Sequence, residues 1–376
     1  MDRGSRLLWA SWTFSVANGL SSPVLGLYLF TGGSMEVSVE FYIVGAAFIL
    51  ATYIAVGMSS GRLRSTASLY RPGLALLAAF YFTLLALGPR AHSCVPPLAA
   101  LYGVASGLYW SGWDIVYYEF ISDRLTFFNR LSYLGFASSL ALPAIYGGVL
   151  AALRSSGYYV LFASSAVGLA VASALMPSLR PSLGSFSVLH MASLPARDRR
   201  YGGLVTALSM LFGYGYSTSY VNPILTYVYF GDSYSRFAEF NYALNVLGVA
   251  VVRARRWMAS RLGAGNLVLY SSAALMASAA ATAVTWRAAP AYLVASSFMG
   301  QMVTFVDVET WNSMRHDRFA EYMTNRHLML NTGRVTASLL VLAVVNFLGP
   351  FTSPLVPGAF ALAGGSYFKV IRRDKP

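Results

Sequence analysis

The chain has 376 residues, of which 56% are hydrophobic and only 11% are charged. A soluble domain carries about 25% charged residues, so this composition argues against a water-soluble fold. The net charge of +13 does not by itself indicate nucleic-acid binding, because the basic residues gather in short segments between long apolar runs. The single cysteine, Cys94, excludes an internal disulfide.

Apolar runs of about 20 residues recur from end to end of the chain, and an α-helix of this length crosses a hydrocarbon core of roughly 30 Å. The first run is too long for the apolar region of a signal peptide, so we interpret it as a retained helix. We therefore predict an all-α polytopic membrane protein with twelve transmembrane helices. The predicted spans are 7–30, 38–57, 72–89, 96–121, 131–153, 157–176, 201–230, 238–256, 264–285, 290–313, 327–348 and 352–371.

The distribution of lysine and arginine predicts the orientation of these spans. An even number of spans puts both termini on one side, and 22 of the 27 Lys and Arg residues fall on that side. Four fall on the opposite side, and Arg334 lies within a span. By the positive-inside rule, we expect both termini in the cytoplasm and the protein in the cell membrane. The bilayer is the expected partner of this basic charge, and nucleic acid is not.

The first and seventh spans each contain a proline at a matching place. Pro23-Val-Leu-Gly-Leu-Tyr-Leu-Phe30 aligns with Pro223-Ile-Leu-Thr-Tyr-Val-Tyr-Phe230 at an offset of 200 residues. A proline inside a helix leaves the carbonyl four residues earlier without its donor. In a membrane such a carbonyl must face protein or water. A packing kink is the alternative for each helix alone, but the repetition favours paired hinges at Pro23 and Pro223.

An acidic motif is also duplicated, inside the fourth and tenth spans. Gly107 precedes Asp114 by seven residues, and Gly300 precedes Asp307 by the same interval. Both copies continue into charged segments with the same order of residue pairs, namely Asp123-Arg124 then Asn129-Arg130, and Asp317-Arg318 then Asn325-Arg326. These matches predict two six-helix halves in the same orientation, at 1–176 and 201–376. A polar, basic cytoplasmic linker at 177–200 joins them.

Two parallel six-helix repeats are the plan of one large class of secondary transporters. The segment after the second span, Gly57-Met-Ser-Ser-Gly61-Arg62-Leu-Arg64, resembles the Gly-x-x-x-Asp-Arg-x-Gly-Arg motif of the major facilitator superfamily. A second copy, Ser260-Arg261-Leu262-Gly263, keeps Arg-x-Gly. Both copies lack the family's acid, so its usual gate pairing is not expected. The resemblance implies alternating access, a gating role for Arg62 and Arg261, and a central cavity lined by the first, fourth, seventh and tenth helices.

The acids within the spans are the strongest candidates for function. A carboxylate near the bilayer centre costs about 2.5–3.5 kcal/mol, so Asp114 and Asp307 should face a bundle interior or water and mark an ion or substrate route. We predict that both couple transport to protons, the alternative being acids that only hold the fold together. We expect Glu309 to form a buried ion pair with Arg334. Glu119 lies nearer the interface, and we interpret it as solvated.

Polar and aromatic residues on the predicted cavity helices are candidates for substrate binding. Such side chains suit a solute with a ring or apolar face and some hydrogen-bonding groups, although many of the 25 tyrosines must be interfacial anchors. The predicted substrate-binding residues are Asn18, Ser22, Trp110, Trp113, Tyr117, Tyr216, Tyr220, Asn222 and Trp311. Gly103 and Gly107 are interpreted as a site of close helix packing.

Other chemistry finds no support in the sequence. A P-loop requires a lysine after glycine, and the only lysines are Lys369 and Lys375. His316 and His327 are interpreted as solvated loop residues without metal-ligand spacing. We therefore expect no enzyme activity, no cofactor and no metal.

The sequence thus predicts a monomeric secondary active transporter of a small organic solute, coupled to protons. The segment from Leu142 to Gly148 partly resembles an antiporter motif of the family and favours export slightly. A receptor or assembly factor on the same scaffold is one alternative, and an ion-independent uniporter is another.

Overall fold

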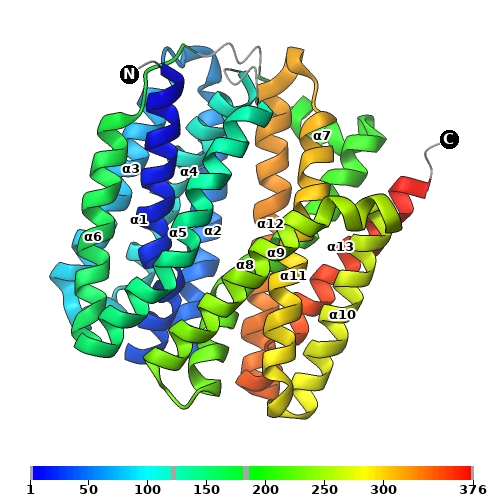
Figure 1. The fold of residues 1–376 in the computed structure, drawn as a ribbon. Helices are drawn as coiled ribbons and strands as arrows, with labels where there is room; N and C mark the ends of the chain where they lie inside the picture. The colour runs from blue at the N-terminus through cyan, green and yellow to red at the C-terminus, as the bar shows by residue number, and fades with distance from the viewer. Residues whose placement is uncertain (1–2, 120–123, 181–185, 374–376) are drawn as a thin grey trace. The chain divides into compact units, whose positions relative to one another are not determined.

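A computed structural model describes residues 3–119, 124–180 and 186–373, and nearly all of them are helical (Figure 1). These residues form thirteen α-helices, of which all but α7 have 19 residues or more. Each predicted span overlaps one long helix, so the prediction of an all-α, twelve-span fold is confirmed. The helices are α1 (Arg3–Gly32), α2 (Met35–Met58), α3 (Ala67–Leu87), α4 (Val95–Glu119), α5 (Arg124–Leu153), α6 (Ser155–Leu175), α7 (Val188–Arg197), α8 (Arg199–Tyr229), α9 (Tyr234–Leu262), α10 (Ala264–Val284), α11 (Ala289–Asn312), α12 (Phe319–Leu348) and α13 (Leu355–Arg373).

Within the described residues, seven segments are long and apolar enough to cross a membrane by length and composition alone. They correspond to α2, α3, α5, α6, α10, α11 and α12. Three of the other long helices, α1, α4 and α8, carry most of the predicted polar site residues. Polar side chains lower mean hydropathy, and in a membrane helix they face the bundle interior.

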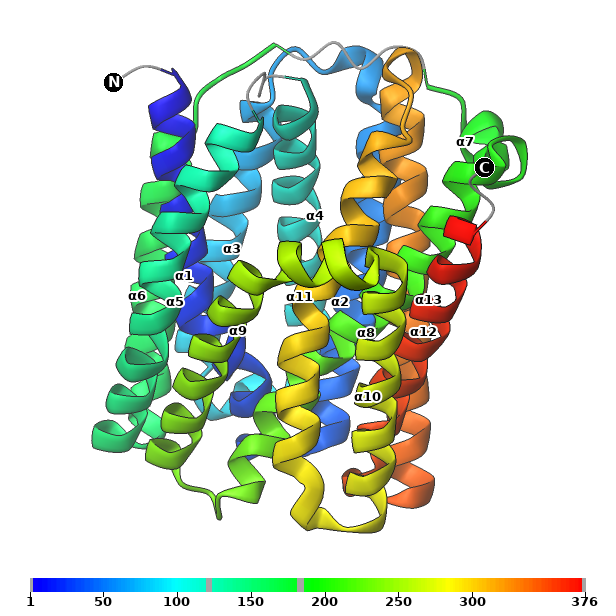
Figure 2. The same ribbon diagram turned by 45° about the vertical axis from the view of Figure 1, so that its right-hand side comes forward.

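The chain divides into two compact units. The first unit is Met1–Val188 with Asp317–Thr324, and the second is Leu189–His316 with Asn325–Pro376. Within each unit the same pairs of helices pack together (Figures 1 and 2): α1 on α6 corresponds to α8 on α13, and α3 on α4 to α10 on α11. Likewise, α2 on α4 corresponds to α9 on α11, and α3 on α6 to α10 on α13. The duplicated sequence motifs therefore lie on equivalent helices of a duplicated structure.

Two segments differ from the sequence prediction. The expected linker contains helix α7, whose Met191 and Leu194 are buried three positions apart on one apolar face. Helix α12 begins at Phe319, eight residues before the predicted span. Its first turns are charged, and two of those charges are compensated, because Arg318 lies 3.8 Å from Glu321 and Arg326 pairs with Asp307. Hydropathy alone therefore placed the start of the helix too late.

Close helix packing at Gly103 and Gly107 of α4 is confirmed, and the structure shows that the partner helix is α2. A Cβ atom added to Gly103 would lie 2.5 Å from the carbonyl oxygen of Gly45, and one added to Gly107 would lie 2.6 Å from Cβ of Thr52. Real Cβ atoms essentially never approach another heavy atom so closely. The two glycines therefore let the axes of α2 and α4 come near each other, as small residues do in membrane bundles.

This contact predicts the effect of one methyl group. We expect Gly103→Ala to lower the free energy of unfolding by about 1–3 kcal/mol, because the backbone of α2 must shift. Gly148→Ala in α5 is the matched control, since a Cβ there meets nothing within 4 Å, and alanine favours a helix over glycine by up to about 1 kcal/mol. Thermal unfolding in detergent, followed by circular dichroism, measures both. Equal melting temperatures for the two variants would contradict the packing argument.

Candidate functional site

Asp114 lies inside the first unit, on the side of α4 that faces α2. Its side chain is 4% exposed, and its Oδ2 accepts a hydrogen bond of 3.0 Å from the hydroxyl of Tyr53 on α2. Tyr53 is itself 1% exposed. The close approach of α2 and α4 at Gly107 brings the phenol within reach. Asp114 is therefore a buried acid with a neutral hydrogen-bond donor, as expected for an acid that does not face lipid.

Three aromatic residues beside Asp114 form a continuous row on α4, here called the α4 ladder: Trp110, Trp113 and Tyr117. The rings of Trp113 and Tyr117 are stacked, with centroids 5.4 Å apart and an angle of 11°. Trp110 meets Trp113 edge to face at 5.9 Å. The spacing of three and four residues keeps all three on the side of the helix near Asp114. The structure thus brings three predicted substrate-binding residues together.

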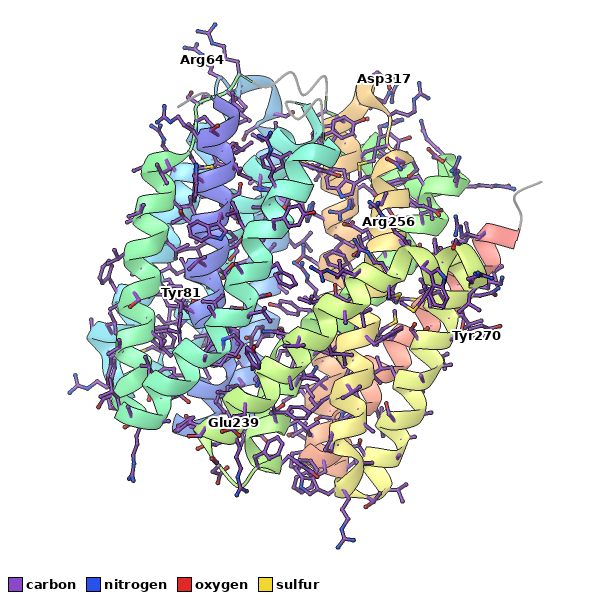
Figure 3. The ribbon with its side chains drawn as sticks, viewed as in Figure 1. Arg64, Tyr81, Glu239, Arg256, Tyr270 and Asp317 are labelled. Atoms are coloured by element: carbon purple, nitrogen blue, oxygen red, sulfur yellow. The ribbon has the colours of Figure 1, made fainter. Side chains whose placement is uncertain are left out.

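Helix α1 supplies the other candidates of the first unit. Asn18 and Ser22 are half-buried and one turn apart on the same face. Their neighbour Ser21 donates a 2.6 Å hydrogen bond to the hydroxyl of Tyr81, which is labelled within the helices in Figure 3. Helix α1 reaches the α4 ladder through the ring of Phe14, which lies edge to face with Trp110 at 5.6 Å.

Asp307 of α11 pairs with Arg326 of α12 in the second unit. The Arg326 side chain is 5% exposed, against 31% for Asp307, and the guanidinium lies 4.5 Å from the ring centroid of Trp311. One buried guanidinium thus joins the acid and the tryptophan that follows it one helical turn later. A cation over a tryptophan face is attractive in addition to the ion pair.

The early start of α12 explains why sequence reasoning missed this arrangement. The sequence placed Arg326 in a cytoplasmic loop and interpreted His327 as solvated. Both residues lie inside α12 and are 4% and 6% exposed, and the His327 Nε2 atom is 3.3 Å from the Arg326 guanidinium. The interpretation of His327 as a solvated loop residue is therefore wrong. The only signal in the sequence was the alignment of Asn325-Arg326 with the first half.

A second arginine lies two turns further along α12. Arg334 donates a 3.0 Å hydrogen bond to Oδ1 of Asn331, and its guanidinium lies over the rings of Tyr216 and Phe212 at 5.2 and 5.3 Å. The Phe212 ring is also 5.7 Å from the guanidinium of Arg326. Two arginines of α12 therefore flank one aromatic ring of α8. Phe212 was not among the predicted site residues.

The predicted ion pair between Glu309 and Arg334 is wrong. Glu309 binds Arg372 of α13, with Oε1 and Nη2 2.8 Å apart. Asp307 and Glu309 are two residues apart and point to different sides of α11, so they meet cations from different helices. Counting residues from the loops placed Arg334 at a similar depth, but depth does not determine which helix faces Glu309.

The remaining candidates of α8 make contacts inside the second unit. Tyr220 donates a 3.1 Å hydrogen bond to Oγ of Ser338, and its ring meets Tyr216 edge to face. Nδ2 of Asn222 donates to Oγ of Ser296 at 2.9 Å. Among the described residues, no side chain donates to the buried Oδ1 of Asn222. That oxygen is available to accept a hydrogen bond.

The expected hinge and gate residues are placed, but no contact tests their roles. Pro23 and Pro223 lie inside α1 and α8, which both continue through the proline. Arg62 closes a short 3-10 helix, Ser60–Arg62, and Arg261 lies in the last turn of α9. Both arginines are exposed.

Asp123 and the side chain of Glu119 lie outside the described residues. In the part of the chain that is described, no group of three His, Cys, Asp or Glu could hold a metal ion.

Comparison with known proteins identifies the fold. No family model matches the chain. It is 25% identical over 370 residues to Uncharacterized protein YqgE of Bacillus subtilis (strain 168), a match covering 91% of this chain and 82% of that protein. The structure of the nucleoside transporter NupG matches with a TM-score of 0.68, 14% identity and complete coverage of both chains. That of the peptide transporter POT matches with a TM-score of 0.71 and 13% identity over 98% of this chain and 94% of the other. The chain has the major facilitator fold.

The major facilitator fold makes this chain an integral membrane protein with two equivalent repeats. Helices α4 and α11 correspond in these repeats, so Asp114 and Asp307 occupy equivalent positions. Tyr53 donates a hydrogen bond to Asp114, and Arg326 pairs with Asp307. Both acids are therefore contacted by side chains from another helix of their own unit.

Proposed function

We propose that the chain is a secondary active transporter that moves a small organic solute across the membrane by alternating access. The observation that carries the proposal is the pair of acids, Asp114 and Asp307, at equivalent places of a duplicated membrane fold. Each lies beside aromatic side chains, the α4 ladder in one unit and Trp311 in the other. An acid kept inside a membrane bundle costs free energy and marks an ion or substrate route.

We propose that protons are the coupling ion and that the two acids bind them. The hydrogen bond from Tyr53 supports this role at Asp114, because a phenol can donate to the carboxylate and can rotate to accept from the carboxylic acid. Proton binding by Asp307 would replace its ion pair with Arg326 by a hydrogen bond to a neutral acid, because a carboxylic acid keeps an acceptor oxygen for the guanidinium.

The substrate proposed here has a ring or apolar face and several hydrogen-bonding groups. The α4 ladder supplies aromatic faces, as do Tyr216 and Tyr220, and the buried Oδ1 of Asn222 accepts a hydrogen bond. Asn18 and Ser22 add an amide and a hydroxyl. Nucleosides and short peptides are the first solutes to test, because proteins of the same fold transport them.

Movement of the two units is proposed to hinge at Pro23 and Pro223, with Arg62 and Arg261 at the gate. We propose that the termini are cytoplasmic, that a single chain suffices, and that net movement is outward. The basis for direction is the segment around Pro143 of α5, which partly resembles an antiporter motif.

Proton movement driven by solutes tests this function without knowledge of the substrate. The purified chain is reconstituted in liposomes that enclose a pH-sensitive dye, and nucleosides, short peptides and sugars are added in separate pools. We expect one pool to change the internal pH, with protein-free liposomes as the control. Solute binding without flux of solute or protons contradicts the proposal and favours a receptor, whereas solute flux that ignores pH favours a uniporter.

A further inference from the structure

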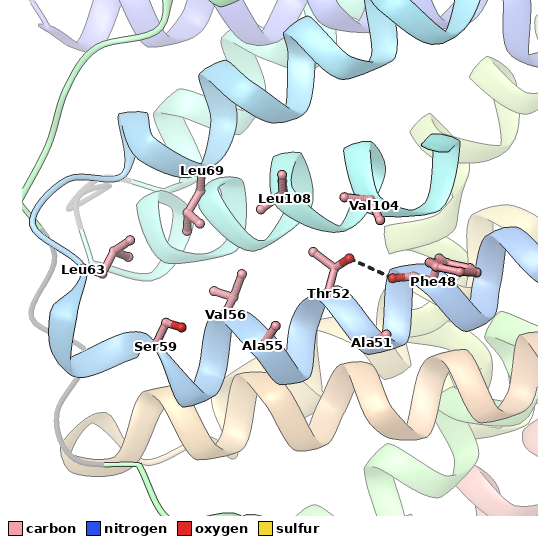
Figure 4. A pocket seen from close by; sticks show the side chains of 10 residues that line it. All are labelled: Phe48, Ala51, Thr52, Ala55, Val56, Ser59, Leu63, Leu69, Val104 and Leu108. Atoms are coloured by element: carbon pink, nitrogen blue, oxygen red, sulfur yellow. Dashed lines mark hydrogen bonds between the residues drawn. The ribbon is translucent and has the colours of Figure 1, made fainter. Parts of the chain in front are cut away.

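The first unit has an apolar groove that the proposed transport function does not use. It has a volume of about 470 Å³ and lies between α2, α4 and the start of α3 (Figure 4). Its rim includes Phe48, which is 41% exposed, and Ser59, while Thr52 forms part of the buried floor. The Thr52 hydroxyl donates to the carbonyl of Phe48 at 2.8 Å, so the one hydroxyl in the floor is satisfied. The residues lining the groove are Phe48, Ala51, Thr52, Ala55, Val56, Ser59, Leu63, Leu69, Val104 and Leu108.

The groove faces away from the α4 ladder. Val104 lies nine positions before Trp113, and Leu108 lies nine positions before Tyr117. Nine residues are roughly two and a half turns of an α-helix, so each pair points in opposite directions. The groove and the α4 ladder are therefore on opposite sides of α4. The lining is apolar and the rim is exposed, so in an integral membrane protein this groove suits a lipid.

The dimensions of the groove suit one acyl chain. Its α2 wall runs from Phe48 to Ser59, eleven positions of helix or about 16 Å. The hydrocarbon core is roughly 30 Å thick, so this wall spans about half of it, the depth of one leaflet. The exposed alanines Ala51 and Ala55 leave room along the rim where larger side chains would fill the groove.

Two exposed arginines are the chain neighbours of a residue at one end of the groove. Leu63 lines that end, and its neighbours in the chain, Arg62 and Arg64, are both exposed. Figure 3 shows the Arg64 side chain projecting from the end of the helices. An acyl chain that enters the groove only exchanges one apolar environment for another, so selectivity must come from the headgroup. Two arginines at the mouth select a negative headgroup, since each basic residue near a membrane surface favours anionic lipid.

We propose that this groove is a binding site for one anionic phospholipid, with an acyl chain between α2 and α4 and the phosphate at Arg62 and Arg64. The site lies wholly within the first unit and does not depend on transport. It binds phosphatidylglycerol in preference to phosphatidylcholine, because both offer the same acyl chains and only the first carries a net negative charge.

Native mass spectrometry of the purified full chain, titrated with phosphatidylglycerol or phosphatidylcholine, tests the charged end. We expect tighter binding of phosphatidylglycerol, and a loss of about 25-fold in the double variant Arg62→Ala/Arg64→Ala, at about 5-fold for each arginine. Arg90→Ala/Arg287→Ala is the matched control, since both of these arginines are exposed and lie in other loops. Equal binding of the two lipids, or an equal loss in the control, overturns the proposal.

A second pair of variants tests the apolar part. We expect Ala55→Trp to fill the groove and reduce the binding of both lipids, whereas Ala86→Trp on the exposed face of α3 leaves it unchanged. Circular dichroism and gel filtration establish that each variant is folded. Full retention of phosphatidylglycerol by folded Ala55→Trp overturns the assignment of the acyl chain to this groove.

Discussion

Asp307→Asn is expected to lower the free energy of unfolding by about 3 kcal/mol. The substitution leaves the buried guanidinium of Arg326 without its carboxylate, and removing one partner of a buried ion pair costs about 3–5 kcal/mol. We expect the lower end of this range of costs because the Asp307 side chain is 31% exposed. The stacking of Arg326 on Trp311 remains in the variant and does not replace the lost charge. Unfolding in detergent by increasing sodium dodecyl sulfate, followed by circular dichroism, measures the change.

Two further variants separate the ion pair from a general effect of the substitution. The double variant Asp307→Asn/Arg326→Gln should recover at least half of the loss, because no charge stays buried without its partner. Asp114→Asn makes the same substitution at the equivalent position, where an amide oxygen can still accept the hydrogen bond from Tyr53, and its unfolding is measured beside the other two. A double variant that is less stable than Asp307→Asn would show that the pair is not the source of the loss.

Asp114→Asn is expected to abolish transport driven by a pH gradient while leaving solute exchange in place. An amide keeps the shape of the side chain and its hydrogen bond with Tyr53, but it cannot bind and release a proton. Solute accumulation in liposomes under an imposed pH gradient should fall by more than about tenfold, a change of at least about 1.4 kcal/mol in the coupling free energy. Exchange of labelled for unlabelled solute without a gradient should stay within about twofold.

Glu309→Gln is the matched control for this experiment. It removes a second acid from a membrane helix by the same chemical change, but Glu309 pairs with Arg372 on another side of α11. Coupling should therefore persist in Glu309→Gln, although its stability should fall. Gradient-driven accumulation in Asp114→Asn equal to that of the unsubstituted chain would remove Asp114 from the coupling step.

The general plan of the fold could be predicted because it depends on local and repeated patterns. Apolar runs of membrane length locate twelve helices, and each run overlaps one long helix of the structure. The match of Gly107 and Asp114 with Gly300 and Asp307 indicated a repeat, and α4 and α11 pack equivalently in the two units. Small residues four apart indicated a close helix contact of α4, and the structure shows that its partner is α2.

The site was predicted less completely, because side-chain partners come from different helices. The sequence put Asp114 and three aromatics on one helix, and their spacing of three and four residues was enough to place them on one side. It could not show that Tyr53 reaches Asp114. The partner of Asp307 was missed because Arg326 was assigned to a loop. A hydropathy value counts arginine as charged even where a carboxylate on another helix compensates the charge.

The sequence by itself therefore determined the class of protein, its twelve helices, its internal duplication and the acids that stand out within apolar spans. These follow from periodicity and from the cost of charge in a membrane, which act along one segment at a time. Only the tertiary structure decided that Arg326 binds Asp307, that Glu309 binds Arg372 and not Arg334, and that Phe212 lies between two arginines. Those contacts depend on the rotation of one helix against another, and hydropathy and spacing within single segments do not specify it.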